Sequence, residues 1–180
     1  SQLWMAMTML DSSRAKSVIA KKTSSNINDV KNMIIWGNHS PTMYPDVENV
    51  SINGKTASTV IDDMDWVEND FLPTVQQRGK SVIDARGASS ATSAAKAALD
   101  TIIACENTTD DGDCFSAAIA SDGAYGVPEG LICGYPLITL EDGSVEIKRD
   151  IVLSDFAMEK FKISIDELSS ERDAVKHLLK

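Results

Sequence analysis

Three strand-like segments in the second half of the sequence follow one another with only turns between them. They span residues 114–120, 131–140 and 144–150, and are joined by the Gly- and Pro-rich stretch SDGAYGVPEG and by the turn Glu141-Asp142-Gly143. Strands joined by short turns pair antiparallel, because a parallel pair needs a longer crossover, usually a helix. This β-meander, with helices segregated from strands along the chain, predicts an α+β fold in which helices pack on an antiparallel β-sheet.

The helical segments are recognised by their apolar spacing. Residues 11–23 carry an apolar stripe at helical spacing, and Asp11 is the candidate N-cap. Residues 65–86 predict a helix that is broken at Pro73. Residues 89–106 give the clearest helix, and the first half of this segment is nearly all Ala and Ser. Such small side chains let another backbone or a flat ligand approach closely.

Shorter signals complete the expected secondary structure. An apolar run predicts a buried strand that ends at Trp36, and a second strand around residues 47–52 closes on the Asn53-Gly54 turn signal. In the tail, the sequence Ser-Ile-Asp-Glu at 164–167 predicts a capping box, behind which an amphipathic helix follows.

Charge and length exclude several classes of function. The 180 residues are 43% hydrophobic, which is enough for one folded core, and the net charge is −10. Binding to phosphate groups needs clustered Lys and Arg, and the densest basic pair here is Lys21-Lys22. We therefore expect neither nucleic acid nor a membrane as a partner. No apolar run approaches the roughly 20 residues that span a bilayer.

Cysteine usage favours a reducing compartment. Cys105, Cys114 and Cys133 are odd in number and have no CxxC spacing, so we expect neither a disulfide framework nor a zinc site. The acidic loop NTTDDGDC resembles a calcium loop, but the Glu required at its twelfth position is absent. The expectation is a cytoplasmic protein without a bound metal.

The expected strand that ends at Trp36 leads into Gly37-Asn38-His39-Ser40, and His39 is one of only two histidines in the chain. A lone histidine beside an apolar strand is more often structural than catalytic. Asp11 and Arg14, three residues apart on a helix, can equally form a local ion pair. If the three side chains converge, the carboxylate orients the imidazole and raises its pKa, while the guanidinium binds a carboxylate. That arrangement would be a proton-transfer site for a small carboxylic acid.

Four segments of the chain resemble, in the same order, segments of the malate dehydrogenase family, specifically its cytosolic-type branch. They cover nearly the whole chain. Lactate dehydrogenases share the Asp-x-x-Arg and the His, but carry a GEHGDS-like sequence in place of WGNHS. The four segments are MTMLDSSRAKSVIAKK, VKNMIIWGNHSPTMYPDV, TVQQRGKSVIDARGASSATSAAKAA and SDGAYGVPEGLICGYP.

The resemblance implies specific roles for the matching residues. Asp11 would be the carboxylate of a His–Asp relay, and Arg14 would bind the C1 carboxylate of the substrate. His39 would take the hydroxyl proton of malate while hydride leaves C2 for the nicotinamide, and would return it when oxaloacetate is reduced. Ser89 or Ser90 would border the substrate, and His39 and Ser89 would also lie beside the nicotinamide.

Other matching positions are given smaller roles. Gly37 and Asn38 are expected to shape the backbone, and Arg78 is expected to form a structural ion pair. The resemblance implies NAD as the cofactor, with NADP left open. It also implies a homodimer as the assembly.

The sequence departs from the family pattern in what it lacks. No GxGxxG occurs, and the arginine-bearing mobile loop that distinguishes oxaloacetate from pyruvate is absent. The chain begins without Met in an apparent strand, so we expect residues 1–10 to be the last strand of a missing dinucleotide-binding domain. Residues 11–180 would form the C-terminal substrate and catalytic domain. Such a chain is expected to be inactive without the dinucleotide-binding half, which is thus its expected partner.

Two alternatives come from other functional classes. One is a non-catalytic oligomerisation or scaffold domain of the same fold. The other is a metal-dependent hydrolase that uses Asp11 and His39, but the chain lacks further ligands at recognisable spacing. A scaffold would be free to lose any of Asp11, Arg14 and His39, and all three are present.

Overall fold

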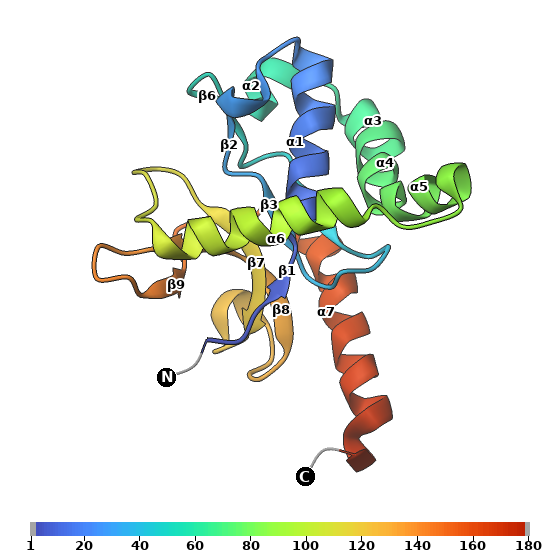
Figure 1. Cartoon of the computed structure of the whole chain (residues 1–180), viewed down its shortest axis with the longest axis vertical. Coiled ribbons are helices and arrows are strands. Elements are labelled where there is room, and N and C mark those ends of the chain that lie inside the picture. Colours follow the sequence, from blue (N-terminus) through green and yellow to red (C-terminus); the bar gives the residue numbers. More distant parts are fainter. Residues whose placement is uncertain (1–2, 179–180) are drawn as a thin grey trace.

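The computed structural model describes residues 3–178, and its largest sheet is four-stranded and antiparallel throughout. Strands β1 (Ala6–Met7), β7 (Phe115–Ala120), β8 (Ile132–Thr139) and β9 (Val145–Ile147) lie in the order β1-β7-β8-β9 (Figure 1). The meander predicted from the sequence is confirmed, and so is the α+β fold with antiparallel sheet.

Two smaller antiparallel sheets contain the remaining strands. One is three-stranded and consists of β2 (Val30–Lys31), β5 (Ser51–Ile52) and β6 (Lys55–Thr56). The other pairs β3 (Ile34–Trp36) with β4 (Tyr44–Asp46). The predicted strand that ends at Trp36 is confirmed as β3.

The predicted strand at residues 47–52 is wrong in extent. Only Ser51–Ile52 is a strand, because the chain turns after Asp46. The Asp46 carboxylate accepts hydrogen bonds from the backbone N–H groups of Glu48 and Asn49, at 3.0 and 3.1 Å, and these bonds fix the turn. The Asn53-Gly54 turn is confirmed as the connection from β5 to β6.

Strand β3 lies across β8 at an unusually close approach between two glycines. Gly37 and Gly134 form an antiparallel bridge, with N···O distances of 3.2 and 2.7 Å. A Cβ on Gly134 would lie 2.4 Å from the carbonyl oxygen of Ile35, so any side chain there would push the strands apart. This contact fixes where β3 ends and where the His39 loop begins.

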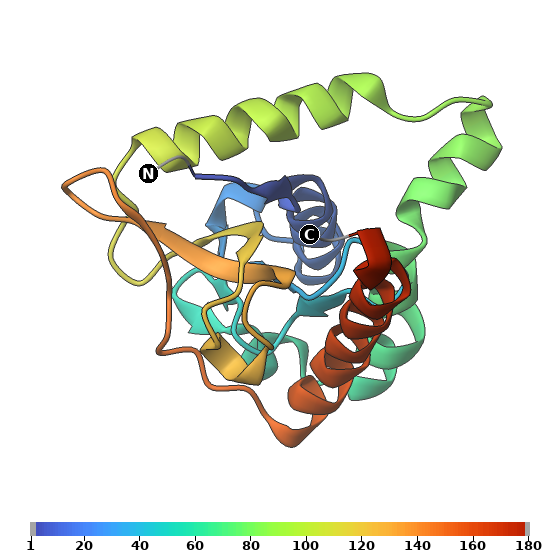
Figure 2. The same cartoon turned by 90° about the horizontal axis from the view of Figure 1, so that it is seen from below.

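Three long helices surround the sheets: α1 (Met9–Thr23), α6 (Ala91–Glu106) and α7 (Asp155–Val175). Figure 1 shows α6 crossing in front of α1, and Figure 2 shows α6 along one side of the molecule, with α5 leading into it. None of the helices within residues 3–178 is long and apolar enough to cross a membrane. The shorter helical elements are η1 (Ile27–Asp29), α2 (Ala57–Ile61), α3 (Met64–Trp66), the π-helix η2 (Val67–Phe71), α4 (Leu72–Gln76), α5 (Arg78–Arg86), η3 (Ala124–Gly126) and η4 (Lys176–Leu178).

The expected helix break at Pro73 is wrong. The helix continues through this proline and is interrupted at Gln77, where φ is −97° and ψ is 1°. A π-turn precedes the proline, with the N–H of Leu72 donating to the carbonyl of Val67. Pro73 therefore stands at the start of α4, where a missing N–H costs little.

Both predicted helix caps are also wrong. Helix α7 begins much earlier than residue 164, because Ser154 is its cap and accepts a hydrogen bond from the N–H of Ala157 at 3.1 Å. The Ser-Ile-Asp-Glu segment lies in the middle of α7 instead. Helix α1 begins at Met9, so Asp11 lies within its first turn and is not the N-cap.

The core is centred on Trp36 at the end of β3. This side chain is completely buried, and its ring packs against Tyr125 and Phe161 with centroid distances of 4.7 and 5.0 Å. Its indole Nε1 donates to Asp46 Oδ2 at 3.0 Å. Burial raises the pKa of the Asp46 carboxyl group, against the hydrogen bonds that it accepts. Trp36 thus anchors the strand directly before the polar loop.

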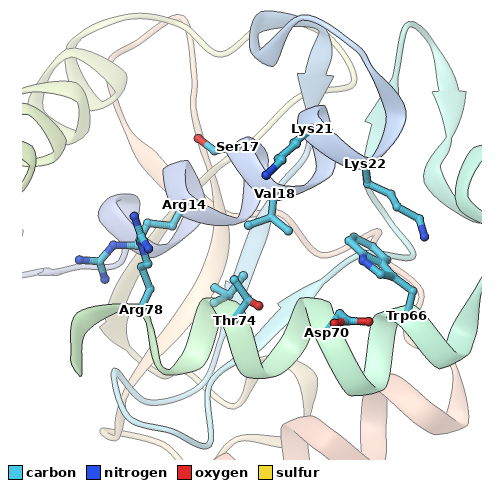
Figure 3. A pocket seen from close by; sticks show the side chains of 10 residues that line it. Arg14, Ser17, Val18, Lys21, Lys22, Trp66, Asp70, Thr74 and Arg78 are labelled. Carbon is cyan, nitrogen blue, oxygen red and sulfur yellow. The ribbon is translucent and has the colours of Figure 1, made fainter. Parts of the chain in front are cut away.

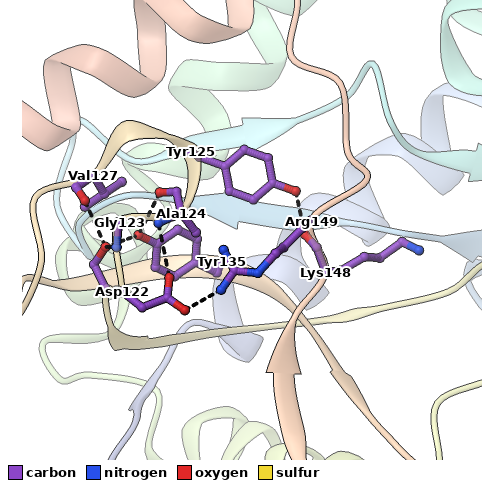
Figure 4. A network of polar contacts seen from close by, with 9 residues as sticks. Asp122, Gly123, Ala124, Tyr125, Val127, Tyr135, Lys148 and Arg149 are labelled. Atoms are coloured by element: carbon purple, nitrogen blue, oxygen red, sulfur yellow. Dashed lines mark hydrogen bonds and ion pairs between the residues drawn. The ribbon is translucent and has the colours of Figure 1, made fainter.

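The stretch SDGAYGVPEG between β7 and β8 is fixed by its own polar network (Figure 4). The Tyr135 hydroxyl donates to Ser121 Oγ at 2.8 Å, and Asp122 forms an ion pair with Arg149. Tyr125, which packs on Trp36, is held in a left-handed backbone conformation with φ at 54°. These contacts stabilise the core around Trp36 and give the segment a structural role.

Candidate active site

The first turn of α1 presents Asp11 and Arg14 on the same side. The Arg14 guanidinium donates from Nη1 to Asp11 Oδ1 at 3.1 Å, and the Asp11 side chain is only 1% exposed. Between them, the Ser12 hydroxyl donates to the carbonyl of Met33 at 2.9 Å. This last bond attaches α1 to the segment that enters β3. It fixes the position of the helix relative to the loop after β3.

The loop after β3 brings His39 to the same carboxylate. His39 Nδ1 lies 2.7 Å from Asp11 Oδ2. Within the described residues, Asp11 Oδ2 accepts no hydrogen bond of good geometry. Its contact with His39 is therefore an ion pair in which the imidazole N–H does not point straight at the oxygen. The other side of the imidazole faces outward, since 61% of the side chain is exposed.

The environment of His39 favours its charged form. Its contact with the Asp11 carboxylate raises the pKa of the imidazole above the usual value. Partial burial and the positive charge of Arg14 act in the opposite direction but are outweighed. A histidine of raised pKa next to a buried carboxylate can hold a proton near neutral pH and release it to a substrate oxygen.

Three side chains that the sequence singled out therefore meet at one place. Asp11 is the centre, with one oxygen toward Arg14 and the other toward His39. The spacing of these residues in the sequence did not determine whether their side chains converge. The catalytic roles of the three residues stay predictions, and the geometry they require is present.

The structure does not bring Ser89 and Ser90 to this group. Ser89 is exposed and Ser90 is half-buried, directly before α6. Within residues 3–178, no hydrogen bond joins either side chain to His39, and the Ser90 carbonyl accepts the N–H of Ala94 at 3.2 Å as part of the helix start. Their assignment as substrate- and nicotinamide-bordering residues stays a prediction.

A basic cavity of about 620 Å³ lies between α1 and the helices α3 to α5 (Figure 3). Figure 3 shows the guanidinium groups of Arg14 and Arg78 side by side at one end of it. Arg78 forms none of the ion pairs found among the described residues, so the expected structural ion pair is not seen there. The lining residues that carry charge are Arg14, Lys21, Lys22, Asp70 and Arg78.

The acidic loop before β7 binds a lysine. Asp113 Oδ2 lies 3.0 Å from Lys31 Nζ, and the loop thereby connects β2 to the start of β7. The part of the chain that the structure describes contains no group of three or more His, Cys, Asp or Glu side chains that could hold a metal ion.

Two residues near the site were missed by sequence reasoning. Ser164 and Glu167 on α7, assigned to a helix cap, contact the loop that carries His39. Asn38 N–H donates to Ser164 Oγ at 2.7 Å, and Ser40 Oγ donates to Glu167 at 2.5 Å. No local sequence signal reveals such contacts, because the partners lie more than a hundred residues apart.

Comparisons with known proteins agree on one family. Residues 8–179 match the model of the lactate/malate dehydrogenase alpha/beta C-terminal domain. Over 173 residues, the chain is 49% identical to a malate dehydrogenase from Cutibacterium acnes, covering 96% of this chain and 52% of that protein.

Solved structures give the same result. A malate dehydrogenase from Naegleria fowleri matches with a TM-score of 0.89 and 38% identity, over 97% of this chain and 53% of the other. A lactate dehydrogenase from Trichomonas vaginalis, in complex with NADH and oxamate, matches with a TM-score of 0.89 and 28% identity, over 97% and 54% of the two chains. The chain thus spans about half the length of the relatives it matches.

Proposed function

This chain belongs to the lactate/malate dehydrogenase family, as its alpha/beta C-terminal domain, and from this membership we propose that it supplies the substrate-binding and proton-transfer groups of an enzyme that interconverts malate and oxaloacetate. The observation that carries the proposal is the contact of one buried carboxylate, Asp11, with both His39 and Arg14. The WGNHS sequence and the 49% identical malate dehydrogenase favour malate over lactate.

Each of the three residues has a distinct part in the proposed mechanism. Asp11 holds His39 by Nδ1, so that Nε2 faces the substrate and exchanges a proton with its C2 oxygen. The negative charge of Asp11 stabilises the imidazolium that forms when malate is oxidised. Arg14, which uses one nitrogen toward Asp11, has further N–H groups for a planar, paired contact with the C1 carboxylate.

The residues present fit a nicotinamide ring in part. The exposed imidazole of His39 leaves its outer face open to a substrate and a flat ring, and Ser89 precedes the small-residue half of α6. The chain has no glycine-rich phosphate loop, so we propose that another part of the enzyme holds the dinucleotide. When bound, NAD (or NADP) would accept on its nicotinamide ring the hydride that leaves C2 of malate. This chain alone is then inactive, because only one of the two reactants is positioned.

The outer surface of α6 supports the proposed partners. Leu99, Ile102 and Ile103 are 55%, 60% and 49% exposed on one helix, an apolar surface of the kind that partners cover. We propose the dinucleotide-binding half and a second copy, in a homodimer, as its contacts. The same surface favours the second candidate function, a non-catalytic scaffold domain. Three free cysteines fit the proposed cytoplasmic location.

One experiment tests the proposal directly. The chain is co-expressed with an N-terminal half from a malate dehydrogenase relative, and oxaloacetate-dependent oxidation of NADH is measured. We expect turnover with both halves and none with either half alone. A folded, assembled complex that does not turn over oxaloacetate would favour the scaffold function. Pyruvate in place of oxaloacetate checks the substrate, and NADPH in place of NADH checks the cofactor.

A further inference from the structure

The loop that carries His39 has little structure of its own. Residues 39–42 form bends and turns, with two hydrogen bonds from backbone N–H groups inside the loop: Met43 N–H donates to the Ser40 carbonyl at 3.1 Å, and Thr42 N–H donates to Ser40 Oγ at 3.0 Å. His39 itself is 61% exposed and contacts Asp11 alone among the ionic groups described. Apart from this contact with Asp11, the position of the imidazole depends on the residues on either side of it.

Those flanking residues all bind one carboxylate on α7. Asn38 Nδ2, Ser40 Oγ and Thr42 Oγ1 donate to Glu167 Oε2 at 3.0, 2.5 and 2.6 Å. Asn38 Nδ2 also donates to Glu171 Oε1 at 3.1 Å, so Glu167 is the carboxylate that all three residues share. Glu167 forms none of the ion pairs found within residues 3–178. Partial burial alone would raise the pKa of Glu167, but the hydrogen bonds from Ser40, Thr42 and Asn38 lower it. The carboxylate is thus charged, and its hydrogen bonds are of the strong, charge-assisted kind.

A second residue of α7 holds the start of the loop. The buried Ser164 hydroxyl accepts the N–H of Asn38 at 2.7 Å and lies 3.1 Å from Thr42 Oγ1. A Cβ on Gly37 would lie 2.1 Å from this hydroxyl, so the backbone fits against α7 only because residue 37 is glycine. Helix and loop are therefore in direct contact on both sides of His39.

We propose that Glu167 is the positioning residue for His39: three hydrogen bonds that its carboxylate accepts from the loop fix residues 38–42, so that Nδ1 of the imidazole stays against Asp11. This inference rests on the proposed function for its catalytic meaning. Ser164 supports Glu167 by fixing the backbone at Asn38. Asp11 thus orients the ring directly, and Glu167 orients it through the loop.

The test uses the fact that the chain has two histidines. The imidazole signals of His39 and His177 are followed by NMR over pH in the wild-type chain and in Glu167→Ala. We expect the His39 pKa to fall toward the ordinary value of about 6.5, and the signals of His177 serve as the internal reference. In the co-expressed enzyme, kcat/KM should fall by about 10²-fold. Asp166→Asn is the matched control, because it removes an exposed charge one residue away on α7, paired with Lys162.

A neutral variant separates positioning from charge. Ser40→Ala with Thr42→Val removes two donors to Glu167 and changes no charge. In this double variant we expect the His39 pKa to shift in the same direction as in Glu167→Ala. A further variant, Glu167→Gln, keeps hydrogen-bond acceptance without the charge and should retain more activity than Glu167→Ala. If Glu167→Ala does not fold, the double variant alone still tests the proposal. A folded double variant with the wild-type His39 pKa and wild-type kcat/KM would overturn the proposal.

Failure of the proposed function has a different signature. If the co-expressed wild-type enzyme does not turn over oxaloacetate while the His39 pKa still responds to the double variant, the dehydrogenase assignment is overturned and the contact through Glu167 is supported. If the enzyme is active but neither variant changes the His39 pKa or kcat/KM, the positioning role alone is overturned.

Discussion

His39 Nδ1 lies 2.7 Å from Asp11 Oδ2, and this contact joins an exposed loop to a buried position on α1. Asp11 is 1% exposed and is also bound to Arg14, so its carboxylate is held in place by the protein itself. Because the buried carboxylate contacts Nδ1, the other ring nitrogen, Nε2, is left on the exposed side of the imidazole.

Replacing the imidazole should remove proton transfer and leave the fold unchanged. In the co-expressed enzyme, we expect His39→Asn to lower kcat for oxaloacetate reduction by about 10²–10⁴-fold, the usual contribution of a general acid. The melting temperature should change little near pH 8, since the side chain is mostly exposed. His177→Asn is the control and should retain full activity. Near wild-type turnover in His39→Asn would show that the proton comes from another group.

The raised pKa of His39 predicts how stability depends on pH. The contact with Asp11 stabilises the imidazolium, so its contribution to folding is fully present below the unfolded-state pKa of about 6.5 and is lost as pH rises through the folded-state pKa. Unfolding by denaturant should therefore show a stability gap between wild type and His39→Gln at pH 5.5 that closes by pH 9. A gap of constant size would mean that the imidazolium is not stabilised by Asp11.

Substituting lysine for Arg14 should affect the substrate more than the fold. Lysine keeps the charge but loses the planar pair of N–H donors, so we expect a higher KM for oxaloacetate and a kcat/KM reduced about 10- to 100-fold. Steady-state kinetics of the co-expressed enzyme measure this change. Lys21→Arg, a charge-conserving change in the same basic cavity, is the control. Unchanged KM and kcat in Arg14→Lys would contradict the carboxylate-binding role.

Two glycines with similar φ angles allow a matched test of the contact between α7 and the loop. Gly37 and Gly54 have φ values of 87° and 75°, but a Cβ would meet Ser164 only at Gly37, and nothing lies within 4 Å of one at Gly54. Gly54→Ala should lower the free energy of unfolding by about 1–2 kcal/mol from backbone strain alone. Gly37→Ala should lower the free energy of unfolding by clearly more than Gly54→Ala does, and should also shift the His39 NMR signals. If both variants lost the same free energy of unfolding, α7 would be able to move away from a side chain at residue 37 without cost.

Much of the fold could be predicted because it depends on local patterns. The meander, the strand ending at Trp36, the helices α1 and α6, and the Asn53-Gly54 turn follow from apolar periodicity and turn residues. Errors arose where a tertiary contact overrides a local signal. The π-turn before Pro73 lets the helix continue, and the Ser164–Glu167 segment contacts the loop in place of capping a helix.

The sequence by itself determined three residues of the site: an acidic and a basic residue, Asp11 and Arg14, on one helix turn, and His39 at a strand end. Only the tertiary structure decided that they meet, because their meeting depends on β3 lying against β8 at Gly134 and on α7 packing on Trp36 through Phe161. Periodicity is set by neighbours in the chain, whereas the convergence of side chains depends on contacts between distant segments, which no local pattern encodes.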